Sequence, residues 1–264
     1  MNPFPIDAYA YANRLHAAHP AEKMLFTGVV TAITLASGSP LVAALALLLV
    51  LVAVTWLAGI GLAAFWRFVR VPLGFILVGA ITMTVSVVGE GEALMQVTAG
   101  AWRIGVTPAA LQRSVSVLSV SLACVSATLF LALTTPLVDV AAQLRRWRVP
   151  ALAIDLMLLT YRFIFVLVET AQAMHLAQEA RLGYSSPGRS LSSAGALVSF
   201  LLGRALARAD ALFTSLTARG YAGELTVLEE EFVWSPRHAS LIAAATFMLV
   251  AAAVAARVWG VWGT

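Results

Sequence analysis

The chain has 264 residues, of which 61% are apolar and only 11% are charged, and its formal net charge is +4. A soluble domain is about half apolar and about a quarter charged, so this composition excludes a soluble enzyme, a disordered tail and a disulfide scaffold. The mean hydropathy of +0.89 indicates folding in a bilayer. We interpret the single cysteine, Cys124, as a small buried hydrophobe. The basic charge favours cytoplasmic loops over nucleic acid as a partner.

Five apolar segments are candidates to cross the membrane. About twenty mixed residues precede the first of them, so we expect no cleavable signal peptide. No charged residue lies between Lys23 and Arg67, and a turn at Gly38-Ser39-Pro40 divides this stretch. The predicted spans are 24–37, 41–58, 71–89, 114–135 and 239–256.

The segment 151–168 is apolar enough to span but carries Asp155 and Arg162, with Glu169 just beyond. These residues are seven apart and would form one polar stripe on a helix. Because charges that face lipid are costly, we predict a helix that packs against protein or lies at the membrane surface.

Sidedness follows from the basic residues. Nine of the 17 lie within residues 145–219, between the fourth and last predicted spans, so the positive-inside rule places that region in the cytoplasm, together with the N-terminus, and leaves 90–113 outside. The nine are Arg145, Arg146, Arg148, Arg162, Arg181, Arg189, Arg204, Arg208 and Arg219.

We therefore predict an all-α polytopic membrane protein with about five transmembrane helices and a cytoplasmic region of long helices. Its parts are an N-terminal segment with four spans (1–135), the cytoplasmic region (136–236) and the final span (237–264). Pro136 and Pro150 bracket a first cytoplasmic helix, 137–147, which is followed by helices from 151 to about 182 and from about 193 to 218.

The second and third cytoplasmic helices end in similar sequences, Ala180-Arg181-Leu182-Gly183-Tyr184 and Ala218-Arg219-Gly220-Tyr221. One interpretation is a pair of ordinary caps, with glycine at positive φ and arginine near the last carbonyls. The other is a pair of helix tips, each presenting a guanidinium and a ring to a carboxylate-bearing groove on one of two similar partners. Arg204 and Arg208 lie within roughly 60° of Arg219 around the third helix.

These features resemble the transmembrane T component of energy-coupling factor transporters, and within that family the cobalt-type branch, CbiQ. Ala218-Arg219-Gly220 matches the family's signature in full, and Ala180-Arg181-Leu182 matches it with leucine in place of glycine. Tyr161-Arg162-Phe163 is also similar to the family, and Ile6-Asp7 and His19-Pro20 with Lys23 are similar to the cobalt-type branch.

The resemblance implies a non-catalytic subunit of an ATP-driven importer in the bacterial inner membrane. Two ABC-type ATPase subunits would dock at the two motifs, with Tyr184, Tyr221, Arg204, Arg208 and Arg162 in support. Their closure would be transmitted to a membrane substrate-binding subunit that captures Co²⁺, and a small accessory membrane protein is left open. The chain itself would hold no cofactor or metal, and ATP would be bound by the partners. Lys23 is the only lysine and follows no phosphate-binding loop, which agrees with this.

Other residues are given structural interpretations. His16 and His19 have a workable metal spacing, but Pro20 and their placement favour an interfacial segment, and His175 and His238 are isolated. The serines of 114–126 favour helix packing over a partner surface.

Three alternatives remain at this point. The substrate could be nickel or a vitamin, because nothing in the chain selects the metal. A self-sufficient permease would need mid-span polar groups and repeated spans. An intramembrane enzyme would need paired acids, and Glu90 and Glu92 are better read as a solvated turn.

Overall fold

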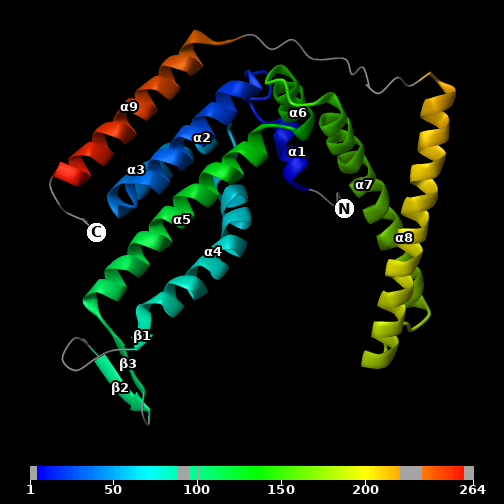
Figure 1. The fold of residues 1–264 in the computed structure, drawn as a ribbon, viewed down its shortest axis with the longest axis horizontal. Coiled ribbons are helices and arrows are strands. Elements are labelled where there is room, and N and C mark those ends of the chain that lie inside the picture. The colour runs from blue at the N-terminus through cyan, green and yellow to red at the C-terminus, as the bar shows by residue number, and fades with distance from the viewer. Residues whose placement is uncertain (1–4, 88–94, 100–101, 221–233, 259–264) are drawn as a thin grey trace. The chain divides into compact units, whose positions relative to one another are not determined.

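The computed structural model describes residues 5–87, 95–99, 102–220 and 234–258 (Figure 1). The chain forms two compact units. The bundle unit comprises residues 6–136 and 231–264, and the hairpin unit comprises residues 137–230 with the first five residues.

The bundle unit is built from helices that mostly begin at a proline, whose fixed φ suits the first turn and whose missing N–H is not needed there. Gly38 ends one of them in the left-handed conformation, with its N–H donated to Thr34 O at 3.3 Å. The elements are α1 (Pro5–Ala12), α2 (Pro20–Ser37), α3 (Pro40–Val52), the π-helical turn η1 (Ala53–Leu57), α4 (Leu62–Thr84), α5 (Pro108–Thr134) and α9 (Pro236–Val258).

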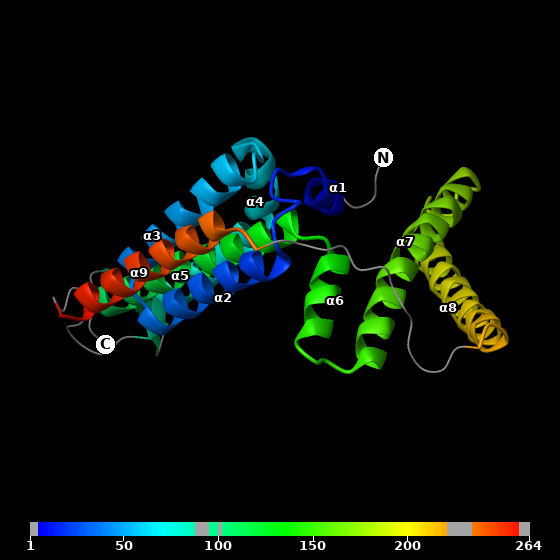
Figure 2. The same ribbon diagram turned by 90° about the horizontal axis from the view of Figure 1, so that it is seen from above.

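Helix α5 packs against α2, α3 and α4, and α9 packs against α2 and α3. Figures 1 and 2 show α2, α3, α5 and α9 lying side by side along most of their lengths. The contacts use small residues, including Ala46 on α3 and Ala123 and Ala127 on α5, all fully buried. Small side chains let helix backbones approach closely, which is how helices associate in a lipid environment.

The predicted third span is wrong at both ends. Helix α4 begins at Leu62 and ends at Thr84, so Arg67 and Arg70, expected to precede the span, lie on the helix. Phe65 and Val69, four residues apart, are buried on one face and extend the helix toward its N-terminus. Pro72 stands inside α4, which is visibly bent in Figure 1, as expected where proline removes a backbone hydrogen bond.

Helix α5 begins at Pro108, six residues before the predicted start at 114, because Thr107 caps it by accepting a hydrogen bond from Ala110 N at 3.1 Å. A small antiparallel sheet precedes it, in the order β1-β3-β2, formed by β1 (Val85–Val87), β2 (Met95–Ala99) and β3 (Trp102–Val106). The sequence predicted a loop here; Glu90 and Glu92 lie outside the described residues. The predicted helical fold class is confirmed, and the sheet is an addition to it.

Within the described residues, six helices are long and apolar enough to cross a membrane: α3 with η1, α4, α5, α7 (Ala151–Ala180), α8 (Pro187–Ala218) and α9. The chain is a multi-pass membrane protein. Helix α2 is not among the six, because it includes Glu22 and Lys23 near its start, but it packs in the bundle as a fifth long helix. Helices α7 and α8 are among the six, so their cytoplasmic placement stays a prediction.

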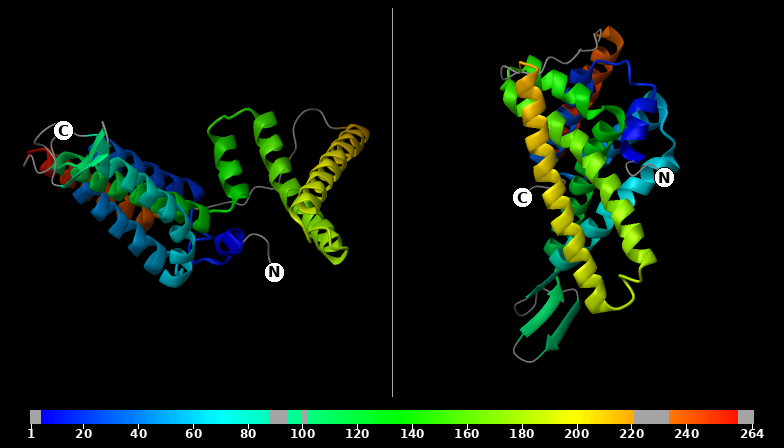
Figure 3. Two further views of the ribbon diagram at one scale, coloured as in Figure 1. Left: turned by 90° about the horizontal axis from the view of Figure 1, so that it is seen from below. Right: turned by 90° about the vertical axis from the view of Figure 1, so that its right-hand side faces the viewer.

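The hairpin unit contains α6 (Leu137–Arg146), α7 and α8. Arg145 of α6 pairs with Asp155 of α7, with Nη2 and Oδ1 3.1 Å apart, and the Asp155 side chain is only 2% exposed. Asp155 therefore does not share one exposed polar stripe with Arg162 and Glu169. Helices α7 and α8 run in opposite directions as a hairpin (Figures 1 and 3). Helix α8 begins at Pro187, six residues earlier than predicted, after an N-cap at Ser186.

Candidate functional site

The first of the two predicted tips is the C-terminus of α7. The helix ends at Ala180, and Arg181 is its C-cap residue with φ −95°. Leu182 then takes φ +58°, a left-handed conformation that L-residues other than glycine rarely adopt, and donates its N–H to Glu179 O at 2.9 Å. The Arg181 side chain is exposed and has no ion pair among the described residues.

The second tip, at the C-terminus of α8, repeats this geometry. Arg219 is the C-cap residue with φ −94°, and Gly220 takes φ +77° and donates its N–H to Thr217 O at 3.0 Å. Arg219 is exposed in the same way. Leu182 and Gly220 therefore occupy equivalent positions, and the leucine that departs from the family signature leaves the turn unchanged.

The expectation that glycine would take positive φ at both ends holds for Gly220 and is wrong for Gly183. At Gly183 the missing side chain instead allows α7 and the start of α8 to lie close together. A Cβ at this position would lie 2.7 Å from Ser193 Oγ and 2.8 Å from Gln178 O. The Gly183 N–H donates to Gln178 O at 2.8 Å, which completes a Schellman-like end to α7.

Gln178 ties this first tip to the beginning of α8. Its Nε2 donates to Ser193 O at 2.9 Å, and its Oε1 accepts a hydrogen bond from the Tyr184 hydroxyl at 2.8 Å. Ser193 Oγ in turn donates to Gly183 O at 2.9 Å. These bonds, which we call the elbow, fix the turn that carries Arg181.

Tyr184 is held inside the elbow and is not presented at the tip. Its ring stacks on His175, with centroids 4.5 Å apart and the planes inclined by 25°, in addition to the bond to Gln178. Tyr221, the corresponding residue after the second tip, lies outside the described residues.

The two tips are far apart along the hairpin. Arg181 lies in the turn before α8 and Arg219 directly after it, and α8 has 32 residues. At 1.5 Å per residue, α8 is about 48 Å long, and the two turns that carry the arginines lie at its opposite ends. The hairpin unit therefore has two separated, exposed arginine ends with the same backbone shape.

The surface between the tips is open. No residue of α8 is buried, and Arg204 and Arg208 are exposed on it, as is Arg162 on α7. Apolar side chains are exposed on the same helix, among them Leu202, Leu206 and Phe213. Such a surface, part basic and part apolar, is suited to further contact with protein.

The histidines have structural contacts. His19 is the N-cap of α2 and its Nδ1 accepts from Ala21 N at 3.1 Å, whereas His16 precedes the helix, so the two do not share a helical face. His238, predicted to be isolated, contacts Glu22 with Nδ1 and Oε2 3.0 Å apart. The described residues hold no group of three or more potential metal ligands.

Sequence reasoning missed the elbow residues and the Glu22–His238 pair. Gln178 and Ser193 belong to no recognisable motif. Their closeness in sequence to Arg181 was the one sign that they could contact the turn that carries it. Glu22 and His238 are 216 positions apart, and a single sequence gives no sign of such a contact.

Comparison with known proteins decides the family. The model of the CbiQ family, described as cobalt transport protein, matches residues 12–228, a range that contains both tips. The chain belongs to the CbiQ family. The resemblance to the cobalt-type branch, CbiQ, is thereby confirmed.

Relatives of the CbiQ family agree with this assignment. The chain is 39% identical over 191 residues to the cobalt transport protein CbiQ of Rhodobacter capsulatus, covering 72% of this chain and 73% of the relative. It is 34% identical over 170 residues to CbiQ of Salmonella typhimurium, covering 64% and 76%. A protein of Methanocorpusculum labreanum, named as a fused cobalt transport protein CbiMQ, is 36% identical over 182 residues, which are 69% of this chain and 30% of that longer protein.

Proposed function

We propose that this chain is the transmembrane coupling subunit, the T component, of an energy-coupling factor importer for Co²⁺. It transmits the motion of two cytoplasmic ABC-type ATPases to a membrane subunit that binds the substrate. The observation that carries the proposal is the pair of exposed arginine tips with one backbone geometry at two separated points of the hairpin unit.

Two equivalent tips suit two equivalent partners. A guanidinium at a helix end can make paired hydrogen bonds to a carboxylate in a groove, and these are among the stronger polar contacts in proteins. Each tip is followed by a left-handed residue that turns the chain away from the helix axis, so the arginine is left at the end. The same groove on each of two identical ATPases can therefore receive both tips.

The separation of the tips supplies a transmission mechanism. Helix α8 lies between them and cannot shorten, since each backbone hydrogen bond fixes its rise. When ATP binding closes the two ATPases, α8 keeps its length, so the closing motion turns α8 and the helices attached to it as one rigid body. The exposed apolar side chains of α8 then pass this rotation to the membrane partner.

The identity of the substrate and of the membrane partner is supported by the relatives. Two of them are named as cobalt transport proteins, and in the fused CbiMQ protein a CbiQ part is joined to a second part within one chain. We infer that the partner here is a separate membrane subunit of the corresponding kind, and that this chain is active only in the assembled transporter.

Charge reversal tests the docking role. The variants Arg181→Glu and Arg219→Glu should each weaken co-purification of ATPase subunits by about thirtyfold or more, because a buried arginine contact costs about 2 kcal/mol or more when one partner is lost. The double variant should abolish Co²⁺ uptake while its amount in the membrane is unchanged. Arg189→Glu is the matched control, since Arg189 is an exposed arginine of the same hairpin whose side chain bonds only to Ser185 among the described residues. Normal ATP-driven uptake by the double variant would refute the proposal.

A further inference from the structure

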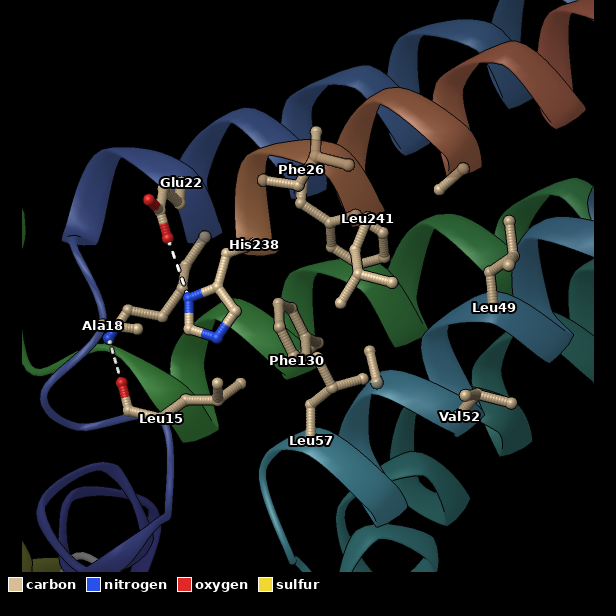
Figure 4. A pocket seen from close by; sticks show the side chains of 14 residues that line it. Leu15, Ala18, Glu22, Phe26, Leu49, Val52, Leu57, Phe130, His238 and Leu241 are labelled. Carbon is tan, nitrogen blue, oxygen red and sulfur yellow. Dashed lines mark hydrogen bonds and ion pairs between the residues drawn. The ribbon is translucent and has the colours of Figure 1, made fainter. Parts of the chain in front are cut away.

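The bundle unit contains a groove between α2, the end of α3, η1, α5 and α9 with about 150 Å³ of free space. Its walls are apolar over most of their length, with Phe26, Leu49, Val52 and Phe130 among them. Figure 4 shows Leu49 and Val52 toward one end of the groove and Glu22 and His238 at the other. The groove is therefore amphipathic along its length.

A second, wider cavity of about 400 Å³ lies beside the polar end. The two cavities share four lining residues, Leu15, Ala18, Leu57 and His238, so they adjoin each other. The wider cavity adds Arg14 and Ser235 to its lining. A molecule with a polar head and an apolar chain fits these two cavities, with its head in the wider, polar one and its chain in the apolar groove.

The acid and the amine at the junction are already satisfied by the protein. Glu22 accepts hydrogen bonds from Ser235 N at 2.9 Å and contacts His238 Nδ1 at 3.0 Å. Lys23 Nζ donates to Leu15 O at 3.1 Å and to Thr134 O at 3.0 Å. Both side chains are almost fully buried, and each is bonded to protein atoms inside the bundle unit.

Arg14 is the cation that remains at the mouth. Its backbone N–H donates to Ala58 O at 3.1 Å, and its stem crosses Gly59 so closely that a Cβ there would lie 2.9 Å from Arg14 Cδ and Nε. Gly59 thus forms a cradle that positions the guanidinium. Among the described residues, the Arg14 side chain has no hydrogen bond or ion pair, so it is available to an anion.

We propose that these two adjoining cavities bind one anionic phospholipid, with the phosphate at Arg14 and an acyl chain in the groove. The guanidinium matches a phosphate in charge and hydrogen-bond geometry, and the apolar walls match a hydrocarbon chain. A free phosphate would leave the apolar groove unused. The bound lipid bridges the segment before α2, η1 and the start of α9, and so stabilises the end of the bundle unit. This role does not depend on the docking of ATPases.

Lipid binding to the full chain, purified with its co-expressed subunits and then delipidated, tests the proposal. Native mass spectrometry would follow titration with phosphatidylglycerol and with phosphatidylcholine of the same acyl chains. We expect about tenfold tighter binding of phosphatidylglycerol, since hydrogen bonds between charged groups are the stronger kind. Arg14→Gln should remove this preference, and Arg14→Lys should keep most of it. Arg67→Gln, which alters an exposed arginine of α4 in the same unit, should leave the preference unchanged.

A larger side chain in the groove tests the binding of the acyl chain separately from that of the phosphate. Leu241→Trp places a larger side chain at the groove from the half-exposed face of α9, and it should weaken binding of both lipids about equally. Inorganic phosphate should not displace phosphatidylglycerol. The proposal is overturned if Arg14→Gln retains the full preference, if Leu241→Trp binds both lipids normally, or if inorganic phosphate displaces the lipid.

Discussion

The two helix tips reach one backbone shape by different means. At the first tip a leucine, Leu182, sits at φ +58°, and at the second a glycine, Gly220, sits at φ +77°. A left-handed residue other than glycine costs about 1–2 kcal/mol. The elbow holds Leu182 in place through Gln178, Gly183 and Ser193, whereas a Cβ built on Gly220 would meet no atom within 4 Å. Contacts around the first tip can hold Leu182 in a strained left-handed conformation. The second tip lacks such contacts near its Cβ position, so it needs glycine, which adopts that conformation without strain.

The largest expected effect is at Gly183, where the elbow would be forced apart. In Gly183→Ala the new Cβ meets Gln178 O and Ser193 Oγ below 3 Å, so the turn must shift away from the last carbonyls of α7 and Ser193 must give way. We expect a loss of about 2 kcal/mol in local stability, as for other overpacked sites. Hydrogen exchange of amides 178–193 would measure it. Protection equal to that of the unaltered chain would show that the elbow does not hold the turn.

Gly220→Ala tests the second tip, where no neighbour opposes the new methyl group. The cost should be only that of the left-handed conformation, about 1 kcal/mol, which lowers the equilibrium constant for forming the tip about fivefold. ATPase co-purification through the second tip should fall by up to that factor. Gly195→Ala, at a helical position of α8 with nothing within 4 Å of the new Cβ, is the control and should not reduce it. Equal losses in both variants would mean that positive φ at 220 is unimportant.

Tyr184→Phe removes one bond from the elbow and keeps the ring on His175. The expected loss is about 0.5–1 kcal/mol, the net worth of a single hydrogen bond. Hydrogen exchange of the same amides should show a smaller change than Gly183→Ala gives. Tyr184→Leu, which removes the stacking as well, should give a larger change than Tyr184→Phe. If the two variants show the same hydrogen exchange, the stacking of Tyr184 on His175 does not contribute to the stability of the elbow.

The smallest change is expected for Leu182→Gly, which restores the signature glycine at the first tip. Glycine relieves the left-handed strain but adds freedom to the unfolded chain, and the two effects nearly cancel to within about 1 kcal/mol. Co²⁺ uptake should be unchanged. A large loss of uptake would show that the Leu182 side chain, which is 66% exposed, itself contacts a partner.

The sequence predicted the helical class, the family and the two arginine ends, because each depends on local composition or on a short motif. It did not place the ends of α4, since buried Phe65 and Val69 extend that helix past Arg67 and Arg70. It also assigned positive φ to Gly183 and not to Leu182, because glycine has the higher intrinsic preference and only the packing of α8 on the turn reverses the choice. The Glu22–His238 contact and the cradle of Arg14 on Gly59 depend on long-range packing that a single sequence does not encode in any readable pattern.

Photocrosslinking from one helical turn before each arginine tests the docking of the two tips most directly. Ala177 and Ser215 each precede their arginine by four residues and are exposed, and Ser199, exposed near the middle of α8, serves as the control position. With a photoreactive aromatic residue at 177 or 215 in the assembled transporter, we expect crosslinks to an ATPase subunit from both positions and none from 199. Crosslinks from 177 and 215 only to membrane subunits or to lipid would contradict the docking of the two tips.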